Sequence, residues 1–121
     1  MTARQKTAQP RARWEHLIRW LPLGATTKAV AYALATFADN DTGENVRPGE
    51  RLLAQATGLS TRAVREHINV LMEEGLLYRR SNGKFNGRRG WASVYVLCAH
   101  DQKIEQAELA EKAWNTGTRI T

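Results

Sequence analysis

Residues 61–74 carry the clearest alternation of apolar and polar positions in the chain. Val64, Ile68 and Leu71 recur at steps of four and three, which places them on one side of an α-helix. Four polar side chains fall on the opposite side: Arg62, Arg65, Glu66 and Asn69. The pattern therefore predicts an amphipathic helix with one side against a core and a charged side facing outward.

The residues just before this helix predict a tight turn from another helix, expected at residues 49–57. Gly58 can end that helix because glycine adopts a left-handed conformation at little cost. Leu59 can then point inward, and the hydroxyl of Ser60 can cap the next helix by accepting a free backbone N–H of its first turn. Ala54 is small enough for the two helices to cross closely. The sequence thus predicts two helices joined by a short turn.

A β-hairpin is predicted after Gly75, which stops the second of these helices. Residues 76–80 and 92–97 are rich in branched and aromatic side chains, and the intervening SNGKFNGRRG contains Asn-Gly pairs that mark turns. Such a hairpin is marginal on its own, so it must lean on the helices. The cations of this predicted wing are Arg79, Arg80, Lys84, Arg88 and Arg89.

Upstream, the sequence predicts a basic arm and two helices. Residues 1–13 lack apolar periodicity and are expected to form a disordered arm carrying Arg4, Lys6, Arg11 and Arg13. A short helix is expected at residues 14–21. A further helix, capped by Thr26 or Thr27 and running to about residue 38, should turn four side chains inward: Val30, Ala33, Leu34 and Phe37. Residues 45–47 are expected to add a short strand beside the hairpin.

The C-terminal residues 101–114 contain strong helix formers, with Ile104, Ala107, Ala110 and Trp114 roughly along one side. This helix can fold back onto the first helix or pair with a second subunit, and both alternatives stay open. Three of the four tryptophans lie in these flanking helices, which favours a homodimer through the N- and C-terminal helices. A dimer would meet half-sites about 34 Å apart in an inverted repeat.

Charge is concentrated in two segments. Nine of the eighteen Lys and Arg residues lie in the arm and the wing, neither of which contains an acid, whereas the formal net charge is only +6. The rest of the chain is therefore net negative. Such a distribution is typical of a protein that neutralises phosphates, and it favours nucleic acid as the partner. No apolar run approaches membrane-spanning length.

Length, composition and motifs exclude several classes. A chain of 121 residues fits one domain, predicted here as residues 14–100 between the arm and a C-terminal helix and tail at residues 101–121. The N-terminus lacks a secretory signal pattern and Cys98 is the single cysteine, so a cytoplasmic location and a packing role for that thiol are expected. No catalytic motif and no cofactor or small-molecule site is visible, so we expect no enzyme.

Two groups of residues carry part of a metal-binding pattern. Asp39, Asp41 and Glu50 stand at the first, third and twelfth positions of an EF-hand pattern, but Gly43 comes one place early and Pro48 interrupts the binding stretch. The histidines are widely separated and fall short of the four ligands that structural zinc takes. The sequence therefore predicts no metal site, and a turn between a helix and a strand explains the acidic residues.

Residues 28–80 resemble the winged helix-turn-helix domains of bacterial, plasmid and phage replication initiators and transcriptional regulators. From Thr27 on, this part of the chain reads TKAVAYALATFADNDTGENVRPGERLLAQATGLSTRAVREHINVLMEEGLLYRR. The shared features are an Asn/Asp/Gly turn, a proline before the second helix and a Gly-Leu-Ser turn before the reading helix. Related domains often have serine where this chain has Gly49. The resemblance implies an α+β fold with a three-helix core, a short strand, a hairpin wing and flanking helices.

By this resemblance, the outer side of the helix at residues 61–74 would read base pairs, through Arg62, Arg65, Glu66 and Asn69. The turn residues Ser60 and Thr61 and the wing cations would contact the DNA backbone or the minor groove. Three functions follow as hypotheses. The first is a transcriptional repressor on double-stranded DNA, the second a DNA-binding part of plasmid or phage replication, and the third a protein-interaction module on the same scaffold. RNA is less suited, because a reading helix fits the major groove of B-form DNA.

Overall fold

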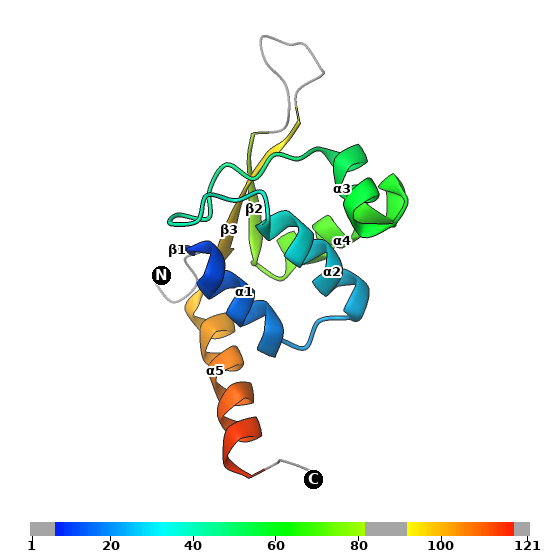
Figure 1. The fold of residues 1–121 in the computed structure, drawn as a ribbon. Coiled ribbons are helices and arrows are strands. Elements are labelled where there is room, and N and C mark those ends of the chain that lie inside the picture. Colours follow the sequence, from blue (N-terminus) through cyan, green and yellow to red (C-terminus); the bar gives the residue numbers. More distant parts are fainter. Residues whose placement is uncertain (1–6, 82–91, 118–121) are drawn as a thin grey trace.

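The computed structural model describes residues 7–81 and 92–117, which form five helices and a three-stranded antiparallel sheet. Figure 1 shows how these elements are arranged. The helices are α1 (Arg11–Trp20), α2 (Ala25–Ala35), α3 (Glu50–Thr57), α4 (Thr61–Glu73) and α5 (Asp101–Thr116). The strands are β1 (Thr7–Ala8), β2 (Leu77–Ser81) and β3 (Val94–Ala99). The predicted α+β class is confirmed, and α3 and α4 lie within a residue of their predicted bounds.

The sheet has the order β1-β3-β2, so β3 is its central strand. β2 and β3 pair antiparallel, with Leu77 opposite Leu97 and Tyr78 opposite Val96, so the two strands predicted on either side of the Asn-Gly turns do pair. Residues 45–47 do not form a strand of their own. Val46 instead makes an isolated antiparallel bridge to Tyr95. The two nitrogen-to-oxygen distances of this bridge are 3.0 and 2.7 Å.

The core lies where α1, α2 and α4 meet the sheet, and each helix contributes one apolar stripe to it. Val64, Ile68 and Leu71 of α4 are buried, as predicted. The inward position predicted for Phe37 was wrong, because α2 ends at Ala35 and the side chain of Phe37 is 36% exposed. Buried Ala31 and Ala35 extend the stripe of α2 instead, because this helix packs against α1, α3 and α4 at once.

Trp14 ties α1 to the sheet. Its side chain is fully buried, and its indole N–H lies 2.9 Å from the carbonyl oxygen of Leu76 and 3.0 Å from that of Cys98. A buried indole N–H requires such partners, because leaving it without one would cost free energy. The thiol of Cys98 is buried too, in agreement with the packing role predicted for it.

The boundary predicted for the disordered arm at residue 13 was wrong. Thr7 and Ala8 pair with Ala99 and Cys98 of β3, and the backbone N–H of Gln9 donates to the carbonyl of Leu97 at 2.9 Å. Helix α1 then begins at Arg11. A two-residue strand carries no periodic signal, and its stability comes from the edge of a sheet that local sequence does not reveal.

Gly43 allows the turn after α2 to approach this N-terminal strand. Its backbone has φ of +74°, and a Cβ atom there would lie 2.0 Å from the carbonyl oxygen of Gln9. The carbonyl of Gly43 accepts from the N–H of Leu97 at 2.8 Å. Glycine is required here for both the left-handed conformation and the close backbone contact.

Helix α5 folds back onto α1, one of the two alternatives considered from the sequence. Ala107 is buried, and Nε2 of His16 lies 2.9 Å from Oε1 of Glu111. The later turns of α5 extend beyond α1 in Figure 1, and they expose Leu109 and Trp114, by 61% and 52%. Helix α5 therefore packs against α1 mainly through its first half.

Candidate nucleic-acid interface

The turn between α3 and α4 sets the position of the candidate interface. Gly58 ends α3 in the left-handed conformation, with φ of +77°, and its N–H donates to the carbonyl of Ala54 at 2.9 Å. Ser60 caps α4 through its side-chain oxygen, which accepts from the N–H of Ala63 at 3.0 Å. The left-handed stop at Gly58 and the cap at Ser60 were both predicted from the sequence and are confirmed. They fix which side of α4 faces away from the core.

The outward side of α4 carries all four predicted base-reading residues. Arg62, Arg65, Glu66 and Asn69 are exposed, whereas Val64, Ile68 and Leu71 on the other side are buried. Nε of Arg62 lies 3.6 Å from a carboxylate oxygen of Glu66, one helical turn later, and both side chains remain largely in solvent. An exposed pair of this kind is weak, so both groups are available to other partners.

Arg65 makes the best-defined polar contact on this side of α4, and its partner comes from α3. Its Nε and Nη2 atoms donate to Oε2 and Oε1 of Glu50 at 2.9 and 2.8 Å. This hydrogen bonding by Arg65 lowers the pKa of the Glu50 carboxyl below its ordinary value, against a smaller raising effect of burial. The same contact raises the pKa of Arg65. Sequence reasoning missed Glu50 as a partner, because fifteen residues separate the two side chains.

The base of the hairpin lies on the same surface. The positive charge of Arg79 in β2 also acts to lower the pKa of Glu50, and its guanidinium carbon lies 5.6 Å from the centre of the Tyr95 ring. Arg80 is held by Glu44, with 3.1 Å between Nη2 and Oε2. Both arginines are exposed. Arg65 thus binds Glu50 directly, whereas Arg79 lies on Tyr95, and Glu44 is a second acidic partner that the sequence did not indicate.

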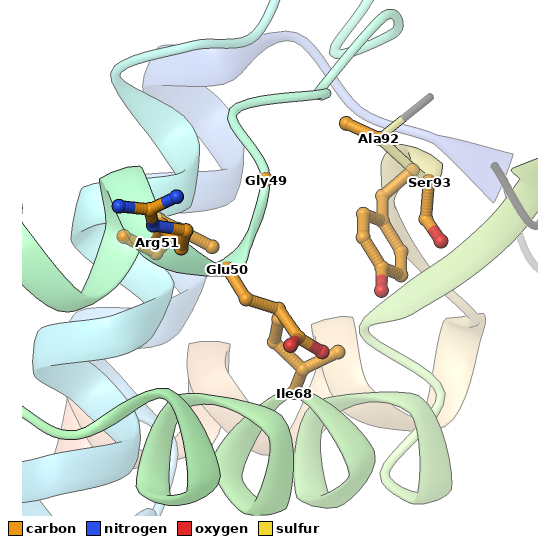
Figure 2. Close-up of a pocket in the computed structure, with 8 residues that line it drawn as sticks. Gly49, Glu50, Arg51, Ile68, Ala92 and Ser93 are labelled. Carbon is orange, nitrogen blue, oxygen red and sulfur yellow. The ribbon is translucent and has the colours of Figure 1, made fainter. Parts of the chain in front are cut away.

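Figure 2 shows a half-open cavity of about 310 Å³ between the start of α3, α4 and the residues leading into β3. Glu50 lies above Ile68, and Ala92 and Ser93 lie on the other side of the hollow. Tyr95 also lines it. Three separate segments build this hollow, so no local pattern in the sequence could indicate it.

The remaining predicted contact residues fall into three groups. Ser60 is exposed and Thr61 half-buried at the start of α4, beside the outward residues. Arg11 and Arg13 belong to α1 rather than to an arm, with α2 between α1 and α4 (Figure 1), so they do not share the surface of α4. Outside the described residues lie Arg4 and Lys6 of the arm and Lys84, Arg88 and Arg89 of the wing, with the turns at 82–83, 86–87 and 90.

Two of the three acidic residues of the calcium pattern, Asp39 and Glu50, bind other side chains. Oδ2 of Asp39 accepts a hydrogen bond from Asn45 at 2.7 Å, and Glu50 holds Arg65. Among residues 7–81 and 92–117, no three His, Cys, Asp or Glu side chains lie together in a way that could hold a metal ion. Across the same residues, no helix has both the length and the apolar character needed to cross a bilayer.

We expect the pairing of Glu50 with Arg65 to make stability depend on pH at the acidic end. Because the pKa of Glu50 is lower in the folded state, the pair stabilises fully above the ordinary glutamate pKa of about 4.3, and this contribution is lost as pH falls through the folded-state value. The effect is small because both side chains are partly solvated.

Melting temperatures of the wild type and of Glu50→Gln, measured between neutral pH and pH 3, would test this. The wild type should be the more stable protein above the glutamate pKa, and the difference should shrink as the solution becomes acidic. A difference that stays constant across this range would show that the charge of Glu50 makes no contribution.

Comparison of the chain with protein-family models, with curated proteins and with solved structures gave no match. The geometry described above therefore has to support a functional assignment by itself.

Proposed function

We propose that this chain is a winged helix-turn-helix domain that binds double-stranded DNA sequence-specifically. In this proposal α4 enters the major groove, and the basic hairpin contacts the phosphate backbone or the minor groove beside it. The observation that carries the proposal is the position of Glu50. It receives Arg65 from α4 and lines the same cavity as Tyr95 of β3, on whose ring Arg79 of β2 lies, so the reading side of the helix lies beside the base of the hairpin.

The chemistry of the α4 surface supports base reading. Guanidinium groups donate to guanine, an amide such as that of Asn69 both donates to and accepts from adenine, and a carboxylate such as that of Glu66 accepts from cytosine. These groups are exposed on one side of a helix whose other side is anchored in the core. A helix held in this way can keep a fixed depth and orientation in a groove, which sequence-specific binding requires.

The charge distribution supports contact with phosphate. Arm and wing together carry half of the Lys and Arg residues and no acid, while the rest of the chain is net negative. Arg79 and Arg80 are exposed at the base of the hairpin, and Arg79 lies on the ring of Tyr95, which lines the same cavity as Ile68 of α4. Cations arranged beside a reading helix increase affinity for any DNA and hold the helix in register. We assign the protein to transcriptional regulation, as a cytoplasmic repressor that occupies a promoter.

Arg65→Ala tests base reading. After the preferred site has been selected from random and genomic fragments, the substitution should weaken binding to that site by about 1–3 kcal/mol and relax preference at one base pair. Arg19→Ala, which removes the same charge from an exposed position of α1, is the matched control and should leave base preference unchanged. Fluorescence anisotropy titrations on the site and on random DNA give both quantities. Equal losses on the two DNAs would show that Arg65 does not read a base.

A further inference from the structure

The ion pair between α3 and α4 uses only one edge of the Arg65 guanidinium. Nε and Nη2 each donate to a different oxygen of Glu50, at 2.9 and 2.8 Å. A guanidinium has five N–H donors, so three remain after these two bonds. The remaining donors are both on Nη1 and one on Nη2, which together form the end of the group. This end is left for another acceptor.

Glu50 is well placed to hold this guanidinium in a fixed direction. It is the first residue of α3, and the N–H of Leu53 donates to the carbonyl of Gly49 at 3.1 Å, so the first turn of the helix is formed. The side chain of Glu50 lies above buried Ile68 of α4 (Figure 2). An arginine tethered in this way has already lost rotamer freedom, so less entropy is lost when it binds.

The free end of the Arg65 guanidinium, formed by Nη1 and Nη2, matches guanine better than phosphate. Two parallel N–H donors fit the O6 and N7 acceptors that guanine presents in the major groove. Phosphate is also an acceptor for a guanidinium, but here the neighbouring carboxylate of Glu50 would repel it. The neutral oxygen and nitrogen of a guanine edge meet much less repulsion. The ion pair with Glu50 therefore favours a contact of Arg65 with a base over a contact with the DNA backbone.

We propose that Glu50 is a positioning residue that orients Arg65 toward a guanine and thereby makes this one base pair specific. The proposal rests on DNA binding by α4, and it names both the residue that sets the specificity and the base that is recognised. Glu50 itself does not touch the base. Its effect passes through the two hydrogen bonds to Arg65.

The test compares Glu50→Ala with Glu108→Ala, which removes the same charge from an exposed position of α5. Each variant is titrated with the selected site, with random DNA, and with a third DNA. In this third DNA, 7-deazaguanine, which lacks the N7 acceptor, replaces the guanine of the selected site at which Arg65→Ala relaxes the base preference. The wild type should lose about 10-fold in affinity on the 7-deazaguanine site. Glu108→Ala should show the same loss. Glu50→Ala should show a much smaller one, while its affinity for random DNA is at least that of the wild type.

A double variant separates positioning from an independent effect. If Glu50 acts through Arg65, then Glu50→Ala combined with Arg65→Ala should discriminate guanine no worse than Arg65→Ala alone. Circular dichroism and melting curves of each variant check that the fold is retained, as expected for a pair at the surface.

The outcomes distinguish this inference from the proposed function. If Glu50→Ala discriminates 7-deazaguanine as strongly as the wild type, the positioning role is refuted, although DNA binding stands. If the wild type is insensitive to 7-deazaguanine and Arg65→Ala lowers the salt slope by about one, Arg65 binds phosphate and the guanine assignment is wrong. If the wild type binds no DNA at low salt, the proposed function fails and the inference fails with it.

Discussion

Replacing Trp14 by alanine is expected to lower the free energy of unfolding by about 3–5 kcal/mol, the range typical of removing a fully buried large aromatic side chain. The substitution leaves a cavity between α1 and the sheet and removes the N–H that donates to the carbonyls of Leu76 and Cys98. The total stability of a small domain is about 5–15 kcal/mol, so the loss is a large fraction of it. Urea unfolding followed by circular dichroism measures the change.

Two further variants make this prediction specific. Trp14→Phe keeps most of the buried surface but removes the indole N–H, and it should cost about 1–3 kcal/mol. Trp114→Ala, at a tryptophan that is 52% exposed near the end of α5, should change stability by less than about 0.5 kcal/mol. Equal effects at Trp14 and Trp114 would contradict the role of Trp14 as the link between α1 and the sheet.

Replacing Lys84, Arg88 and Arg89 together by alanine is expected to weaken binding to every DNA sequence. If each cation contacts one phosphate, the slope of log affinity against log salt should fall by about three, and affinity at moderate salt by on the order of 100-fold. These residues lie between β2 and β3 in the sequence, and Tyr95 of that hairpin lines the same cavity as Ile68 of α4. Titrations at several salt concentrations, on the selected site and on random DNA, measure both effects.

The matched control removes the same charge elsewhere. Arg19, Lys28 and Lys112 belong to α1, α2 and α5, and replacing all three by alanine tests whether net charge alone explains the result. This control should change the salt slope much less than the wing variant does. An unchanged slope in the wing variant, or an equal change in both, would show that the wing does not contact the backbone.

The pattern of neighbouring residues was sufficient to predict most helices and strands of the fold. The apolar stripe of α4, the stop at Gly58 and the cap at Ser60 each depend on residues within a few positions of one another. The same holds for the pairing of β2 and β3, which the branched and aromatic residues on either side of the Asn-Gly turns indicated. Where local preference and packing agreed in this way, the prediction matched the structure.

The errors lie where distant segments meet. Thr7 and Ala8 form a strand because β3 offers them a free edge, and Ala31 and Ala35 are buried because α2 has helices on several sides. Neither fact is visible in the neighbouring residues. Arg11 and Arg13 were consequently assigned to an arm, whereas they belong to the first turns of α1.

The sequence by itself determined the outward residues of α4, because the helical repeat places Arg62, Arg65, Glu66 and Asn69 together wherever the apolar stripe is buried. It also determined the excess of cations in arm and wing. Only the tertiary structure decided that Glu50 binds Arg65 and that Glu50 and Tyr95 line one cavity, since these contacts depend on how α3, α4 and the sheet pack. Side-chain periodicity is a property of one helix, whereas an ion pair between two helices depends on their relative position in space.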